Sequence, residues 1–201
     1  MSNQELPLFS HHFRCPKENN HQSNDANGVD SCQALFVIDG SDLWTSFRGE
    51  ILSIQTAANS AFASSSSLFS ANFWVYGDTK QDQEIPKYFF VSYPEFLNEL
   101  DGAFTYGGKE YIDGAINKLN DYSSKRVIII LYTASSQNLI NTAGKAYKGQ
   151  ARTVAVHQND GIDASPISNY PSPSSSDSKQ ITELIVQACH DLPPGKTRPF
   201  F

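Results

Sequence analysis

Hydrophobic residues in the middle of the chain form short continuous runs that alternate with runs spaced by three and four. The first continuous run, Ala34–Asp39, ends in a polar loop, which is typical of a strand buried on both faces of a parallel sheet. The next apolar positions share one helical face, and the serines from Ser64 to Ser67 end that helix. They are Leu43, Phe47, Ile51, Ile54, Ala58 and Phe62.

The same alternation of strands and helices continues along the chain. Further strands are predicted at Ala71–Tyr76, Lys87–Ser92 (at an edge), Arg126–Leu131 (central) and Ala151–Val156. Helices are predicted at Tyr93–Ala103, Ile112–Leu119, Leu139–Tyr147 and Ile181–Ala188, with a Pro/Ser-rich loop at 165–178. The expected fold is α/β, with a doubly wound, mostly parallel central sheet and helices on both faces. Binding crevices of such folds lie at the carboxyl ends of the strands.

The chain of 201 residues suits one domain between two tails. Residues 1–31 are polar and rich in Asn, Gln and His, so we expect a disordered tail there. The domain is expected at 32–190, and residues 191–201 form a second tail. The first residues lack a basic segment followed by an apolar one, so no secretory signal peptide is expected in this chain.

The net charge of −6, from 15 basic and 21 acidic residues, argues against non-specific nucleic-acid binding. No apolar stretch approaches the roughly 18 residues of a membrane span. The sequence leaves the oligomeric state open.

Two candidate catalytic features fail on inspection. The segment Ala103–Glu110 resembles a phosphate-binding loop but has Ala103 in place of its first Gly and Glu110 in place of the Ser or Thr after the Lys. His157 ends a strand at the crevice, yet no nucleophile pairs with it, which favours a surface role. A hydrolase or nucleotide-binding protein is therefore the least favoured alternative.

A polar loop, Asp39-Gly-Ser41-Asp42-Leu43, follows the first strand. A carboxylate and a hydroxyl two residues apart can converge on Mg²⁺, which prefers oxygen ligands. The alternative, which we favour, is a strand-to-helix turn in which Ser41 or Asp42 caps the helix.

Cys32 lies before the first strong strand and Cys189 at the end of the last helix pattern. Their positions leave two alternatives open, a disulfide that clasps the domain or two buried thiols in a reducing compartment. Cys15, in the first tail, is expected to stay unpaired if the clasp forms.

Several segments together resemble the von Willebrand factor A (vWA) family over about residues 32–190. These are Phe36–Ser41, Tyr106–Gly108 leading into Ile112–Ile116, Val127–Leu131 and Thr153–Val156. The segment Leu131–Ser135 is most similar to divergent vWA modules of secreted nematode proteins that often also carry C-type lectin domains. The resemblance implies that Cys32 and Cys189 form a disulfide, as cysteines flanking extracellular vWA modules do.

The family's metal-ion-dependent adhesion site (MIDAS) uses Asp-x-Ser-x-Ser, a Thr from a second loop and an Asp from a third. Asp39 and Ser41 match this pattern, but Leu43 stands at the third position. The second-loop Thr falls near Glu110, and the third-loop Asp falls at Thr133 or Ala134. Glu110 or Asp113 could supply oxygen only to a rebuilt site. We therefore expect a degenerate site, no cofactor, and at most weak Mg²⁺ binding.

The resemblance implies a non-enzymatic adhesion module, extracellular by its cysteines, that binds a protein or glycan partner. Its binding edge would include Asp42, Leu43, Gly107 and Gly108. A metal-dependent adhesion domain with a rebuilt Mg²⁺ site is the second hypothesis. The sequence does not identify the ligand.

Overall fold

Four parallel strands form the centre of the computed structural model, which describes residues 31–41, 44–64, 69–77, 84–103, 111–122 and 126–192. The strands are β1 (Cys32–Asp39), β2 (Phe69–Tyr76), β3 (Val127–Thr133) and β4 (Arg152–His157). Their order across the sheet is β2-β1-β3-β4, and every neighbouring pair is parallel. The predicted doubly wound α/β fold is confirmed in this part of the chain.

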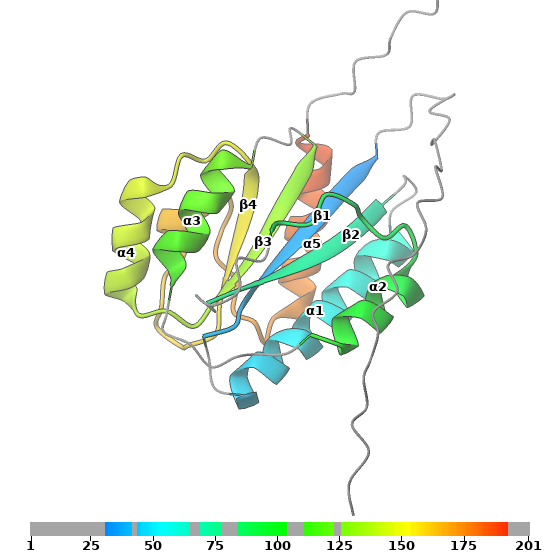
Figure 1. Cartoon of the computed structure of the whole chain (residues 1–201), viewed down its shortest axis with the longest axis horizontal. Helices are drawn as coiled ribbons and strands as arrows, with labels where there is room; N and C mark the ends of the chain where they lie inside the picture. The colour runs from blue at the N-terminus through cyan, green and yellow to red at the C-terminus, as the bar shows by residue number, and fades with distance from the viewer. Residues whose placement is uncertain are drawn as a thin grey trace, which may run out of the picture.

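Helices cover both faces of this sheet (Figure 1). One face carries α1 (Trp44–Ser64), α2 (Tyr93–Asp101) and α5 (Ser178–His190), and the other carries α3 (Ile112–Asp121) and α4 (Gln137–Ala146). A short 3₁₀ helix, η1 (Ser165–Ile167), lies within the segment predicted as loop. The layered arrangement places the carboxyl ends of all four strands at one edge.

The side chains of each inner strand alternate between the two helical layers. Phe36 and Ile130 pack toward α1 and α5, whereas Leu35 and Leu131 pack toward α3 and α4. All four are fully buried. Burial on both faces explains why these strands read as continuous apolar runs.

The prediction of a strand at Lys87–Ser92 was wrong. This segment runs antiparallel beside β2 but makes only one β-bridge, between Ala71 and Phe90. The next position along β2 is taken by the side chain of Asn72, which accepts from the Phe73 N–H and donates to the Tyr88 carbonyl. A side-chain amide thus stands where the sheet ladder would continue.

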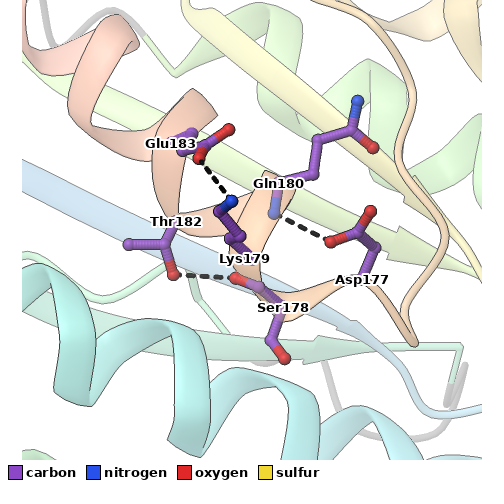
Figure 2. Close-up of polar contacts among 6 residues, drawn as sticks. All are labelled: Asp177, Ser178, Lys179, Gln180, Thr182 and Glu183. Atoms are coloured by element: carbon purple, nitrogen blue, oxygen red, sulfur yellow. Dashed lines mark hydrogen bonds and ion pairs between the residues drawn. The ribbon is translucent and has the colours of Figure 1, made fainter.

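Local hydrogen bonds fix the start of α5, as Figure 2 shows. Asp177 is the N-cap, and its Oδ1 accepts the Gln180 N–H at 2.9 Å. This satisfies one of the N–H groups that a helix leaves unpaired at its first turn. The helix therefore begins at a defined residue after the Pro/Ser-rich connection.

A disulfide joins Cys32, the first residue of β1, to Cys189 near the end of α5, with the two Cα atoms 5.5 Å apart. This is the pairing that the vWA resemblance implies. A loop of this length would stabilise the fold by about 5 kcal/mol in the chain-entropy model. The tails predicted at 1–31 and 191–201, with Cys15, lie outside the described residues except for Ser31, Asp191 and Leu192.

Candidate binding site

The candidate site begins where β1 and β2 end side by side. The Gly40 N–H donates to the Tyr76 carbonyl at 2.6 Å. A Cβ on Gly40 would lie only 2.6 Å from that same oxygen, so a larger residue would force the strands apart. Gly77 has a φ of +107°, a conformation that side chains disfavour, and a Cβ there would meet the Ser41 nitrogen. The two glycines allow both strand ends to turn in close contact.

The carboxylate of Asp39 lies at the centre of this edge and is fully buried. Its Oδ1 accepts hydrogen bonds from the Ser41 N–H, at 3.1 Å, and from the Ser41 hydroxyl. Its Oδ2 accepts from the Tyr76 hydroxyl at 3.0 Å and from the Ala134 N–H at 3.1 Å. Four donors from three strand ends therefore surround one carboxylate.

Tyr76 is a second link between Asp39 and β3, besides the Ala134 N–H. Its hydroxyl oxygen also lies 3.0 Å from the Tyr132 carbonyl oxygen, so one hydroxyl meets two acceptors. Burial raises the pKa of Tyr76 well above its usual value, and the negative charge of Asp39 raises it further, while a hydrogen bond with Thr133 acts in the opposite direction. Tyr76 therefore stays a neutral hydrogen-bond donor at any physiological pH.

The other side of β1 is also polar near its end. The backbone N–H of Asp39 donates to Oε2 of Glu50, a buried residue of α1, at 3.0 Å. Nearby, the Ser53 hydroxyl lies 3.2 Å from the Tyr132 hydroxyl. Burial raises the pKa of Tyr132 above the usual range, so this phenol is neutral as well. Hydrogen bonds on both sides of the sheet thus hold the end of β1.

The loops after β3 and β4 form the outer rim of the site. The Asn159 side-chain amide donates to the Ala134 carbonyl at 3.0 Å, and the Gln158 N–H donates to the Thr133 carbonyl at 3.1 Å. Within the described residues the hydroxyl of Ser135 is buried and has no hydrogen-bond partner. His157 Nδ1 lies 3.0 Å from the Asn159 carbonyl, a contact that fixes the loop.

Three of the four predicted metal ligands come together at this edge. Asp39 and Ser41 are bonded to each other, and Thr133 reaches the same Tyr76 hydroxyl as Asp39. Asp113 lies exposed in the first turn of α3. The remaining predicted residues, Asp42, Leu43, Gly107, Gly108 and Glu110, fall outside the described residues.

In the described part of the site, protein groups already occupy the Asp39 carboxylate. Mg²⁺ requires octahedral oxygen ligands with free lone pairs, but protein donors already take both Asp39 oxygens. The Thr133 hydroxyl oxygen accepts the Ser135 N–H at 3.1 Å. Across the described ranges, no three acidic, Cys or His side chains form a group that could hold a metal.

The sequence analysis missed Tyr76 and Glu50, which hold Asp39 in place. Tyr76 is the last residue of a strand that was predicted correctly and that neighbours β1. Its position could have been inferred, because the carboxyl ends of adjacent parallel strands meet. Glu50 gave no such signal, because it looks like an exposed helix residue until the helix is packed onto the sheet.

Comparisons with known proteins support the fold. No model of a known protein family matches the chain, and no curated protein matches it. The structure resembles that of proximal thread matrix protein 1 from the mussel byssus, described with a zinc-occupied MIDAS motif, with a TM-score of 0.58 and 14% identity. The match covers 81% of this chain and 47% of the mussel protein, so this chain spans about half of its length.

Two weaker matches are vWA structures. The von Willebrand factor type A protein from Catenulispora acidiphila has a TM-score of 0.47 and 12% identity, over 80% of this chain and 42% of that one. The SpRpn10 VWA domain has a TM-score of 0.49 and 13% identity, over 83% of this chain and 99% of that one. The strand order and the likeness to the mussel protein define the class, a doubly wound α/β domain. Among the described residues, no helix is long and apolar enough to cross a membrane.

Proposed function

We propose that this chain is a non-enzymatic interaction module of the vWA family that recognises a protein or glycan partner through the carboxyl edge of its sheet, without a resident metal. The observation that carries the proposal is the buried Asp39 carboxylate with four protein donors. In this proposal a residue that could hold a metal instead holds three strand ends together.

The energetics favour the hydrogen-bonded arrangement. A cation at Asp39 Oδ2 would displace the Ala134 N–H, which would lose its partner, and the Tyr76 hydroxyl, which would keep only the Tyr132 carbonyl as its acceptor. Each buried donor left without a partner costs about 1–3 kcal/mol. The rim formed by Ala134, Asn159 and Gln158 offers polar groups with which a partner could form hydrogen bonds directly.

The disulfide supports an extracellular location. Disulfides persist in oxidising compartments and are rare in the cytosol. The pair Cys32 and Cys189 closes the domain at the end opposite to Asp39, so it stabilises the fold without occupying the binding edge. We also propose, from the resemblance carried by Leu131–Ser135, that the chain belongs with the vWA modules of secreted nematode proteins that often carry C-type lectin domains.

Metal titration tests the first part of the proposal. Equilibrium dialysis with Mg²⁺ and Mn²⁺ should detect no specific binding tighter than about 1 mM to the wild type, because Asp39 has no free lone pair. The Tyr76→Phe variant removes one donor and keeps the ring, and Ser41→Ala removes a potential ligand. Wild-type binding tighter than millimolar that Ser41→Ala abolishes would support the rebuilt Mg²⁺ site instead.

Site-specific cross-linking tests the second part. A photoreactive residue at Asp160, exposed in the loop after β4, should capture a partner from the native tissue in the presence of EDTA. The matched control is Lys148, which is exposed before β4 at the opposite end of the sheet. Capture from Lys148 alone, or capture at Asp160 that EDTA abolishes, would contradict the proposal.

A further inference from the structure

The outer edge of β2 is open over part of its length. The Ala71 N–H and C=O both bond to Phe90, at 2.9 and 2.8 Å, so Ala71 faces away from β1. The N–H and C=O groups of successive residues in a strand point alternately to its two sides, and the register with β1 is unbroken. The N–H and C=O groups of Phe73 and Val75 therefore also point away from β1. Their backbone groups are therefore the ones that a neighbouring strand would meet.

Two features stop segment 84–92 from pairing with these residues. In the antiparallel register set by Ala71 and Phe90, Tyr88 lies opposite Phe73, and Pro86 lies opposite Val75. The amide of Asn72 stands between the first pair, 2.7 Å from the Phe73 nitrogen and 2.7 Å from the Tyr88 oxygen. Pro86 has no N–H to give to Val75.

Three backbone groups of Phe73 and Val75 are consequently left over. They are the C=O of Phe73 and the N–H and C=O of Val75, none of which has a hydrogen-bond partner within the described residues. An edge with unpaired N–H and C=O groups is a template for an additional strand.

A groove of about 170 Å³ lies along these groups. Phe73 and Val75 form one wall, and Pro86 and Tyr88 contribute to the other. Among the described residues, the charged side chains that line the groove are Glu84 and Glu99, both exposed. Tyr88 is 67% exposed, so an aromatic face is available at the rim.

We propose that this groove binds an extended peptide segment of a partner protein, which adds to the edge of β2 and places a Lys or Arg side chain between Glu84 and Glu99. Main-chain hydrogen bonds to Phe73 and Val75 provide affinity, as in other complexes formed by strand addition. The carboxylates and the Tyr88 ring select a cation, which they attract electrostatically.

Lys87 is the competing cation. It lies 3.4 Å from Glu84 Oε2, but both side chains are more than 80% exposed. An ion pair this exposed is worth about 0–1 kcal/mol, so a bound peptide can replace it. Glu99 belongs to α2, which packs beside β2. Its carboxylate lines the same groove as Glu84 and can attract the cation of a bound peptide.

This site does not depend on the proposed function of the carboxyl edge. Its backbone groups belong to β2 and its carboxylates to α2 and segment 84–92, whereas the Asp39 network involves β1, β3 and the Tyr76 hydroxyl. Failure of one proposal therefore leaves the other in place.

Peptide titration followed by ¹H–¹⁵N NMR tests the proposal on the whole chain. The probes are Ac-Thr-Val-Lys-Val-Thr-NH₂, the same peptide with Glu in place of Lys, and the Lys peptide with its central amide N-methylated. The Lys peptide should shift the amides of Tyr76, Gly77 and Tyr88. It should bind roughly three- to tenfold more tightly than the Glu peptide, the range that one or two exposed ion pairs provide.

Two variants separate the charge from the backbone. Glu84→Gln with Glu99→Gln should remove the preference for Lys without abolishing binding. Val75→Pro should weaken the Lys peptide about fivefold, the effect of one lost hydrogen bond. The Val75→Ala variant, which keeps the N–H, is its control and also reports on folding.

Three results would overturn the proposal. The first is no amide shift in β2 or segment 84–92 at millimolar Lys peptide. The second is equal affinity for the Lys and Glu peptides. The third is undiminished binding of the N-methylated peptide, since strand addition requires that N–H.

Discussion

The two edges of the sheet are closed in different ways, and among the described residues only the β4 edge has every outward N–H group paired. On β4, the Thr153 N–H donates to Asn169 Oδ1 at 2.8 Å and the Ala155 N–H to the Ser168 hydroxyl at 3.1 Å. The His157 N–H donates to the Pro173 carbonyl at 3.1 Å. All three outward N–H groups of β4 are thus satisfied. On β2, Ala71 alone pairs with a neighbouring backbone other than β1 in the part of the chain that the structure describes.

The difference shows that a loop can protect an edge better than a segment that resembles a strand. Segment 165–178 reads as loop because it is rich in Ser and Pro, yet its short polar side chains and carbonyls match the spacing of β4. Segment 84–92 has the composition of a strand but meets β2 at Asn72 and Pro86. Edge protection therefore depends on where individual donors and acceptors fall, not on β-propensity.

A matched pair of proline substitutions gives the largest expected contrast. Thr153→Pro removes the N–H that bonds to Asn169 at a fully buried position and should cost about 3 kcal/mol or more. Val75→Pro removes an N–H that has no partner among the described residues and should cost no more than Val75→Ala, about 1 kcal/mol. Urea unfolding of each variant, with Thr153→Val as the side-chain control, measures both. Equal losses at the two positions would show that the edges do not differ.

The Asn169→Ala variant should have the next largest effect. Its Oδ1 accepts both the Thr153 N–H and the Tyr147 hydroxyl, each at 2.8 Å. The free energy of unfolding should fall by about 2 kcal/mol, because the buried Thr153 N–H loses its acceptor. Asn169→Asp, which keeps the oxygen, is the control. Hydrogen exchange at Thr153 should accelerate more than at β1, and a uniform acceleration would speak against a local role in closing the edge.

Alkaline pH should loosen the loop that covers β4. The Tyr170 hydroxyl donates to Asp191 Oδ2 at 2.9 Å, which ties the loop to the end of α5. Burial, together with the hydrogen bond to Asp191 and the negative charge of Asp191, raises the pKa of Tyr170 to about 12, although Arg152 acts in the opposite direction. In the unfolded chain the value is about 10, so the folded state favours the neutral phenol.

The stability contributed by Tyr170 is accordingly complete below about pH 10 and is lost as the pH rises toward 12. Thermal melts of the wild type should show this decline, and the Tyr170→Phe variant should show a smaller decline over the same range. Other buried tyrosines titrate in both proteins, so the difference between them isolates Tyr170. Identical slopes would contradict the assignment.

The smallest effect is expected from Asn72→Ala on the open edge. Its amide links Phe73 to Tyr88, but the groove lets water reach the groups that the variant would free. The loss should be about 1 kcal/mol or less, below that of Asn169→Ala. Chemical denaturation under identical conditions measures the free energy of unfolding of Asn72→Ala and Asn169→Ala. A larger loss of stability for Asn72→Ala would contradict the proposed difference between the edges.

The features of the fold that depend on local hydrophobic pattern could be predicted from the sequence. Those that depend on which residues lie opposite one another in the sheet could not. Continuous apolar runs were enough to place β1 and β3, because strands buried on both faces have no polar positions. The strand at 87–92 was mispredicted because Asn72 and Pro86 act only through the residues opposite them. The same limit applies to the site: Asp39 was identified, but its partner Tyr76 lies 37 positions away.

The clasp between Cys32 and Cys189 determines how the domain bears mechanical load. The described chain starts beside Cys32 and ends shortly after Cys189, both at the end of the sheet opposite to Asp39. Tension applied through the flanking residues is carried by a covalent bond between these two points. The hydrogen bonds of the strands and the Asp39 network lie outside that path. In a protein under tension, the binding edge would keep its geometry until the disulfide is reduced.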